Sequence, residues 1–136
     1  MTEKSDIQAV VDKALTTYGQ IDILYNGAGI HDAYDNAVEL EEDFYDKLMA
    51  INVKAPYLAS KMVIPHFIKQ GGGAIINVGS QATQMAGPGG SAYVTSKHAI
   101  LGFSKQLAFD FGSQGIKVNT LSPGFIKTQM TEGIED

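Results

Sequence analysis

Ala74-Ile75-Ile76-Asn77-Val78-Gly79-Ser80 is the stretch of sequence that decides the fold. Its first five residues form a short, mainly apolar run, and the Gly79-Ser80 pair ends the run as a turn does, which predicts a buried strand over residues 74–78. Helices are predicted on both sides of this strand, over residues 53–68 and 92–111, and Gly71-Gly72-Gly73 ends the first of them. A strand between two helices is typical of a parallel sheet.

The same alternation of helix and strand continues in both directions along the chain. Apolar residues at helix spacing predict a first helix over residues 6–18, with Ser5 as its N-cap and Gly19 as its end. Two further strands are predicted over residues 21–25 and 116–121, and a short helix over residues 44–48. We therefore predict an α/β fold, a three-layer doubly wound parallel sheet with helices on both faces, in a single domain over residues 1–136.

The composition fits one globular domain and excludes several functional classes. The chain has 136 residues, 44% apolar and 18% charged, and a net charge of −5 without a cluster of Lys or Arg, so neither nucleic acid nor an anionic membrane surface is a predicted partner. The absence of cysteine excludes disulfides, thiolate zinc sites and cysteine nucleophiles. No apolar stretch is long enough for a membrane helix, and the first five residues do not resemble a signal peptide, so we expect a cytoplasmic protein.

Each of the three predicted strands ends in small or turn-forming residues. These ends are Asn26-Gly27-Ala28-Gly29, Gly79-Ser80 and Ser122-Pro123-Gly124. Glycine lets a ligand approach the backbone closely, and the ligands of open parallel sheets bind beyond the carboxyl ends of the strands. The need for a turn explains any one of these segments, but the three together favour a ligand pocket at this edge of the sheet.

Tyr93 and Lys97 lie four residues apart in the predicted helix over residues 92–111, and therefore on one face of it. A phenol titrates near pH ~10, too high for acid/base work at neutral pH, but an ammonium about 4 Å away lowers the phenol pKa by up to ~3 units. The pair thus predicts a tyrosine that transfers protons. The alternative, for any Tyr and Lys at this spacing, is that the tyrosine packs in the core and the lysine is solvated.

Several motifs occur together in one order and spacing: Asn26-Gly27-Ala28-Gly29, Asn52, Ser80, Tyr93-x-x-x-Lys97 and Pro123-Gly124. In this set the sequence resembles the classical short-chain dehydrogenase/reductase family, including its 3-oxoacyl carrier-protein reductases. The resemblance implies a Rossmann-like fold and an NAD(P)-dependent oxidoreductase that interconverts a carbonyl and a secondary alcohol by hydride transfer. The implied cofactor is NAD or NADP, and the implied substrate is a small carbonyl or alcohol compound.

The resemblance also implies a role for each matching residue. Tyr93 would donate or accept the proton at the substrate oxygen, and Ser80 would hold that oxygen by a hydrogen bond. Lys97 would lower the Tyr93 pKa and bind the nicotinamide ribose, while Asn52 would hold a water that links Lys97 to solvent. The other matching residues would contact the cofactor, the first three on its adenosine side and the rest at the nicotinamide: Asn26, Ala28, Gly29, Pro123, Gly124, Ile126 and Thr128.

The sequence departs from the family pattern in two ways. Gly27 stands where the family has a second Asn, which predicts the loss of a side-chain tether on that strand. In the family, the first strand, a Gly-rich turn and a helix hold the cofactor pyrophosphate, and the same region distinguishes NAD from NADP. We do not find this region in the chain, so we expect an incomplete domain, truncated at both ends.

Two functional consequences of the resemblance follow. An inactive fragment or assembly module that binds cofactor poorly is the alternative to an active enzyme. The family also implies a homodimer or tetramer, paired through the helices over residues 53–68 and 92–111.

Two further segments contain residues that could have a functional role. The loop with His31, Asp32 and Asp35 contains residue types that bind metals, but it has no helical ligand motif, so we predict a solvated loop and no metal site. Residues 85–90 are small and apolar and lie between Ser80 and Tyr93. They predict a border of the substrate site that suits an uncharged carbonyl compound.

Overall fold

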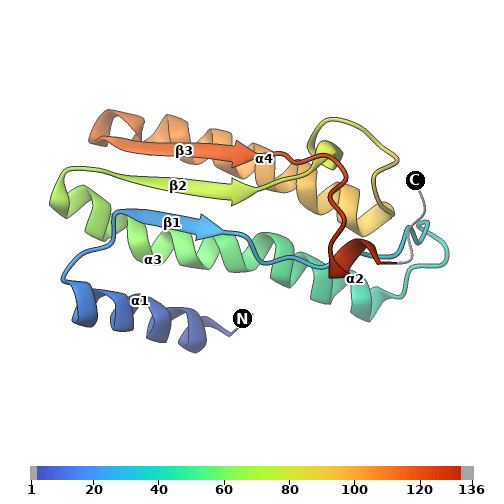
Figure 1. Ribbon diagram of the computed structural model, residues 1–136, viewed down its shortest axis with the longest axis horizontal. Helices are drawn as coiled ribbons and strands as arrows, with labels where there is room; N and C mark the ends of the chain where they lie inside the picture. The colour runs from blue at the N-terminus through green and yellow to red at the C-terminus, as the bar shows by residue number, and fades with distance from the viewer. Residues whose placement is uncertain (1–2, 133–136) are drawn as a thin grey trace.

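Three parallel strands form the sheet, and their order in the sheet follows their order in the chain. The computed structural model describes residues 3–132 (Figure 1). The strands are β1 (Ile23–Asn26), β2 (Gly73–Val78) and β3 (Ile116–Leu121). The central strand, β2, is parallel to both neighbours, and its Ile75 lies opposite Leu24 on one side and Val118 on the other. The predicted parallel sheet is confirmed, although β1 begins two residues later than predicted, because its pairing starts at Ile23 opposite Ala74.

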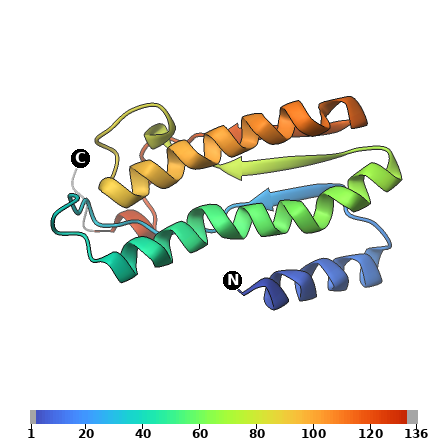
Figure 2. The same cartoon turned by 180° about the vertical axis from the view of Figure 1, so that it is seen from behind.

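The three long helices lie on one side of the sheet (Figures 1 and 2). The helices are α1 (Lys4–Tyr18), α2 (Glu42–Met49), α3 (Ala55–Gln70) and α4 (Ser91–Phe111), and single 3₁₀ turns occur at Gln81–Thr83, Gly112–Gln114 and Gln129–Thr131. In β1, Leu24 packs against the core, whereas Ile23 and Tyr25 are 61% and 60% exposed. Within residues 3–132 the helices therefore cover one face of the sheet rather than the two faces predicted. None of these helices combines the length and the apolar character needed to cross a bilayer.

The two helices predicted over residues 44–48 and 53–68 form one continuous helical segment. A turn of π-helix, Ala50–Lys54, joins α2 to α3, and in it the Ala55 N–H donates to the Ala50 carbonyl. Pro56 has no N–H to bond the carbonyl four residues before it, so a regular α-helix would lose a bond here. The wider turn absorbs this loss without ending the helix.

Glycine ends two of the helices as predicted. Gly19 follows α1 and Gly71 follows α3, and both adopt left-handed φ values, 78° and 91°. The predicted start of α1 is wrong, because Glu3 rather than Ser5 is its N-cap. No side chain accepts a hydrogen bond at this N-cap, so the helix begins without the contact that the prediction assumed.

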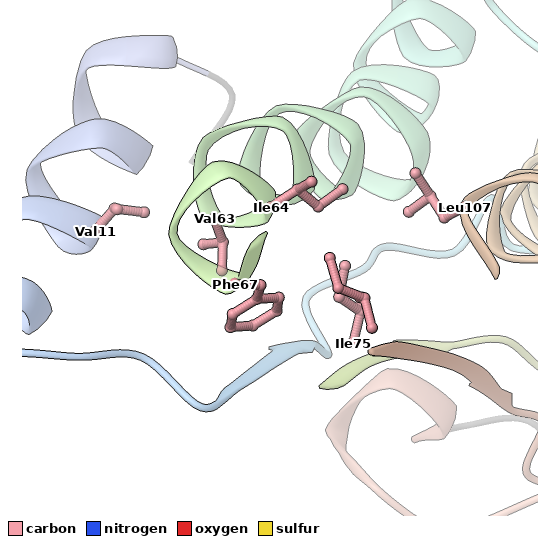
Figure 3. Packing of buried hydrophobic residues seen from close by; sticks show 7 residues of the cluster. Val11, Val63, Ile64, Phe67, Ile75 and Leu107 are labelled. Atoms are coloured by element: carbon pink, nitrogen blue, oxygen red, sulfur yellow. The ribbon is translucent and has the colours of Figure 1, made fainter. Parts of the chain in front are cut away.

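The main core lies between the helices and the sheet. Figure 3 shows Val11 of α1, Phe67 of α3, Leu107 of α4 and Ile75 of β2 around one space. Phe67 and Ile75 are fully buried. A Cβ at Gly73 would lie 2.4 Å from the Phe67 ring, so the glycine that starts β2 makes room for this side chain. The ring therefore fixes the distance between α3 and the sheet.

We expect Phe67→Ala to lower the free energy of unfolding by about 3–5 kcal/mol, because it leaves a cavity at the centre of the core. Tyr18→Ala is the matched control: Tyr18 is 79% exposed, and its truncation should change the free energy by less than ~0.5 kcal/mol. Urea denaturation followed by circular dichroism measures both values. Equal losses of unfolding free energy in the two variants would show that Phe67 is not a central residue of the core.

Candidate active site

A cavity of about 540 Å³ opens at the carboxyl ends of the three strands. Its walls come from the loops after β1, β2 and β3 and from the first turns of α4. Eight of the residues predicted from the sequence line it: Gly29, Ser80, Tyr93, Lys97, Pro123, Gly124, Ile126 and Thr128. The volume lies within the usual range of small-molecule sites, roughly 300–1,000 Å³.

Tyr93 is buried in the first turn of α4, and its phenol is less acidic than predicted. Burial raises the pKa of Tyr93 above its ordinary value, a hydrogen bond with the Ser80 side chain lowers it, and the Asp32 carboxylate raises it. The ammonium of Lys97 lies 5.4 Å from the centre of the phenol ring. The expected lowering of the pKa by Lys97 is therefore wrong for this arrangement, because desolvation of the phenolate has the largest effect and raises the pKa.

Lys97 is only 6% exposed, although its side chain carries a charge. Its Nζ donates a hydrogen bond to the Val78 carbonyl at the end of β2, at 2.9 Å. Burial lowers the pKa of Lys97 from 10.5 to about 8. The amine is thus held at the strand end with its protonation equilibrium moved toward the neutral range.

Asn52 lies in the π-helical turn and clamps the loop after β1. Its Oδ1 accepts the Ile30 N–H and its Nδ2 donates to the Ile30 carbonyl, both at 2.9 Å, and Nδ2 also donates to Ser96 Oγ at 3.1 Å. Asn52 does not line the cavity, but a Cβ at Gly29 would lie 3.3 Å from Asn52 Oδ1 and 3.7 Å from Lys97 Nζ. Glycine at position 29 therefore allows the loop to pass between the two side chains.

Asn26 and Ala28 lie away from this cavity and line a second, mainly apolar hollow between α1 and α3. Asn26 Nδ2 donates to Asn77 Oδ1, and Asn77 Nδ2 donates to Ser104 Oγ, both at 2.8 Å. The tether expected to be missing at Gly27 is thus supplied by Asn26, which connects β1 through β2 to α4. At Gly27, an added Cβ would lie 2.4 Å from the Tyr25 ring, so that ring occupies the space of a larger side chain.

The loop after β1 contributes residues that the sequence analysis missed. His31 and Tyr34 line the cavity. Asp32 is 1% exposed, so the predicted solvated loop is wrong at this residue. Both of its oxygens accept backbone N–H groups at the start of α4, and no pattern in the sequence indicated that contact. Within residues 3–132, no three acidic or histidine side chains lie close enough together to bind a metal ion.

The rest of the cavity wall is largely apolar. Residues of the predicted substrate border line it, together with side chains from the segment after β3: Met85, Ala86, Gly87, Pro88, Phe125 and Met130. Hydrogen-bonding side chains line the same cavity, among them Ser80, Tyr93 and Lys97. Such an arrangement suits a ligand with hydroxyl or carbonyl oxygens at one end and an apolar body.

Comparison with known proteins assigns the chain to a family. The sequence model described as short chain dehydrogenase matches residues 1–136. An oxidoreductase of Thermotoga maritima is 43% identical over 129 residues, which are 95% of this chain and 50% of that protein. A 3-oxoacyl acyl-carrier-protein reductase of the same organism is 37% identical over 137 residues, which cover 100% of this chain and 55% of that protein. The chain thus spans about half the length of the curated relatives it matches.

A solved structure has the same fold. The crystal structure of a gluconate 5-dehydrogenase from Burkholderia cenocepacia, in complex with NADP and tartrate, matches with a TM-score of 0.91 at 30% sequence identity. The match covers 98% of this chain and 52% of that one. The predicted Rossmann-type fold is confirmed by this likeness. From the match of its whole length to the family, we conclude that the chain belongs to the short-chain dehydrogenase family.

Proposed function

We propose that this chain carries the proton-transfer site of an NAD(P)-dependent oxidoreductase that interconverts a carbonyl and a secondary alcohol. The main support is that Ser80, Tyr93 and Lys97 line one cavity at the strand ends, together with apolar side chains. The relatives named above are oxidoreductases, and the structural neighbour is an NADP complex. Membership of the family connects these observations to one reaction class.

Tyr93 acts as the proton donor in the direction of carbonyl reduction. Its raised pKa keeps the phenol protonated at neutral pH, so a proton is available for the substrate oxygen. Ser80 donates a hydrogen bond to the same oxygen and so fixes it beside the phenol. In the direction of alcohol oxidation, Tyr93 accepts the proton instead. The nicotinamide cofactor, when bound, supplies or takes up the hydride.

Lys97 and the glycine-rich turns are suited to hold the nicotinamide ribose. The Lys97 ammonium is already desolvated at the cavity wall, and ribose hydroxyls would give it hydrogen-bond acceptors. At Gly124, an added Cβ would lie 3.1 Å from Gln81 Nε2, so the Gln81 side chain packs closely against this turn. Pro123, Ile126 and Thr128 complete the nicotinamide side.

The other predicted contacts lie further from the reacting atoms. Asn26 and Ala28 would face the adenosine side of the cofactor. Asn52 acts through the loop that it clamps, which places Gly29 beside Lys97. Its hydrogen bonds to Ile30 and Ser96 support this role as a clamp.

The apolar wall favours an uncharged substrate. Met85, Pro88 and Phe125 offer no charge to pair with a carboxylate or phosphate on the substrate body. A ketone or secondary alcohol of moderate size is therefore the proposed substrate class.

An inactive assembly module remains the second candidate. It is favoured by the exposed apolar side chains on the uncovered face of the sheet, Ile23, Tyr25 and Leu121, which are more than half exposed. An enzyme and a module differ in whether they bind the cofactor, and a titration of the purified protein with NADH and NADPH distinguishes them.

In the full-length protein, Tyr93→Phe should lower kcat at least ~100-fold, because the transferable proton is lost. Cofactor affinity, measured by titration calorimetry, should change little, since the phenyl ring still fills its place. Lys97→Ala should lower kcat and weaken cofactor binding, because the amine takes part in both the reaction and the binding of the cofactor.

Two outcomes would contradict this assignment. A Tyr93→Phe variant that keeps more than about a tenth of the wild-type rate would refute the role of the phenol as acid, since its loss should cost 10²-fold or more. Failure of the wild-type protein to bind either cofactor would favour the assembly module.

Lys97→Met should stabilise the protein at pH 7. A lysine pKa of about 8 in the folded chain, against 10.5 ordinarily, means that the unfolded chain binds the proton more tightly. The charge therefore disfavours folding below pH 8, by ~3 kcal/mol, and this penalty falls as the pH rises from 8 toward 10.5. Loss of the bond to Val78 offsets about 1 kcal/mol. We expect a net gain of ~2 kcal/mol at pH 7 that shrinks by pH 9.5.

Urea denaturation at both pH values measures this difference. Lys105→Met, an exposed position in the same helix, is the control and should change stability little at either pH. A destabilised Lys97→Met variant at pH 7 would mean that the bond to Val78 outweighs the desolvation of the ammonium. A buried charge that lowers stability is typical of functional sites.

We also infer that the chain assembles as a homodimer or tetramer through the outer surfaces of α3 and α4. Tyr57 and Phe109 are exposed on these helices, and the Tyr57 ring packs edge-on against Phe103 with 6.2 Å between the ring centres. Exposed aromatic side chains are enriched at protein–protein interfaces, which supports this assignment.

Light scattering at micromolar concentration should show an oligomer. The double variant Tyr57→Glu/Phe109→Glu should be monomeric, because it places charges in the proposed interface. The control Tyr18→Glu/Val38→Glu adds the same charges at exposed positions elsewhere and should remain assembled. A wild-type monomer would rule the interface out.

A further inference from the structure

The loop after β1 contacts the first turn of α4 through one buried carboxylate. Asp32 Oδ1 accepts the Gly90 N–H at 2.7 Å, and Asp32 Oδ2 accepts the Tyr93 N–H at 2.8 Å. The first N–H groups of a helix have no acceptor within the helix and carry partial positive charge. A carboxylate therefore satisfies them and is stabilised by them.

α4 depends on this carboxylate, because its own N-cap residue cannot provide a side chain. The N-cap is Gly90, and no side chain of that residue exists to accept the free N–H groups. A Cβ at Gly90 would lie 2.3 Å from the Asp35 carbonyl oxygen and 2.8 Å from Asp32 Cγ. Glycine at this position thus removes one cap and makes room for another, which the loop after β1 supplies.

The turn that carries Asp32 has an unfavourable backbone. The Asp35 N–H donates to the Asp32 carbonyl at 3.0 Å, which closes a turn over Ala33 and Tyr34, with φ values of 50° and 69°. Left-handed values at two successive residues other than glycine persist only where surrounding contacts hold them. The bonds to α4 provide that hold, including one from the Ser91 N–H to the Asp35 carbonyl at 3.0 Å.

The same loop contacts the Tyr93 side chain. The His31 ring lies 4.4 Å from the Tyr93 ring, centre to centre, and the Tyr34 ring packs edge-on against His31 at 5.0 Å. The N–H that Asp32 Oδ2 accepts belongs to Tyr93 itself. Both the backbone and the ring of Tyr93 are therefore fixed from this loop.

We propose that Asp32 is a positioning residue, whose carboxylate holds the first turn of α4 so that the Tyr93 phenol meets the substrate oxygen. The inference rests on the proposed role of Tyr93 as the acid. Asp32 does not line the cavity, so it acts through Tyr93 and not on the substrate.

The charge of Asp32 gives a readout that global stability does not affect. The titratable groups that face Tyr93 are Asp32, His31 and Tyr34 from the loop and Lys97 from α4. Among them, the Asp32 carboxylate raises the pKa of Tyr93. Removal of this charge should therefore move the titration of the Tyr93 phenol to lower pH.

The experiment compares Asp32→Ala and Asp32→Asn with Asp46→Asn in the full-length protein. Asp46 is exposed in α2, so its variant removes the same charge away from the site. Asp32→Ala should lower kcat about 100-fold through misplacement of the phenol, while KM for the cofactor stays within about 2-fold. Asp32→Asn keeps one acceptor oxygen and should recover most of the rate, whereas Asp46→Asn should match the wild type.

Nuclear magnetic resonance supplies the readout that does not depend on activity. In protein labelled with ¹³C at the tyrosine rings, with Tyr93→Phe used for assignment, both Asp32 variants should shift the Tyr93 titration to lower pH. Exchange of the Tyr93 amide hydrogen should become faster in Asp32→Ala, because its acceptor is gone. Asp46→Asn should change neither quantity.

The proposal is overturned if Asp32→Ala and Asp46→Asn have equal kcat, or if the Tyr93 titration and amide exchange are unchanged in the Asp32 variants. If Asp32→Ala does not fold, the titration of Tyr93 in Asp32→Asn decides: a titration unchanged from the wild type overturns the proposal. Failure of the proposed function is seen separately: an active Tyr93→Phe variant refutes the acid assignment, while the resonance measurements still decide whether Asp32 positions Tyr93.

Discussion

The parallel register of the three strands is the constraint on which the cavity depends. Successive side chains of a strand point to opposite faces, so a slip of one residue between β2 and a neighbour would exchange the faces of a whole strand. In the observed register Ile75 lies between Leu24 and Val118, and all three belong to the core beneath the helices. The same register brings the three strand ends to one edge, where Ser80 follows β2 and Pro123 follows β3. The apolar core, rather than contacts at the cavity rim, therefore aligns the site.

Two buried charges at this edge are held by the backbone. The Lys97 ammonium donates to the Val78 carbonyl at the end of β2, and the Asp32 carboxylate accepts two N–H groups at the start of α4. Burial of an ion is unfavourable unless its hydrogen bonds are made. The ends of regular elements provide such groups, so the fold that aligns the strands also supplies partners for both ions. Tyr93 lies near each of them, and its pKa is raised because burial outweighs the hydrogen bond with Ser80, and the Asp32 carboxylate adds to the increase.

Periodicity and turn residues were enough to predict the strands, the long helices and the parallel sheet. The family resemblance grouped Ser80, Tyr93 and Lys97, and all three line one cavity, since a strand end and the first turns of the next helix meet there. Two errors share one origin. The pKa of Tyr93 and the burial of Asp32 both depend on how the loop after β1 folds against α4, and that loop contains polar residues typical of a solvated segment. Its left-handed turn occurs at residues other than glycine, where sequence gives no signal for it.

The loop after β1 is held at two points, and each comes from a different helical element. Asn52, in the π-helical turn between α2 and α3, exchanges two hydrogen bonds with the backbone of Ile30, and α4 binds Asp32 two residues later. Asn52 also donates to Ser96, whose hydroxyl donates to the Tyr93 carbonyl at 2.8 Å. Both ends of the Tyr93 backbone thus connect to the same short loop, one through Asp32 and the other through Ser96 and Asn52. Groups joined in this way share any relaxation, so the orientation of the phenol is a property of the network and not of a single contact.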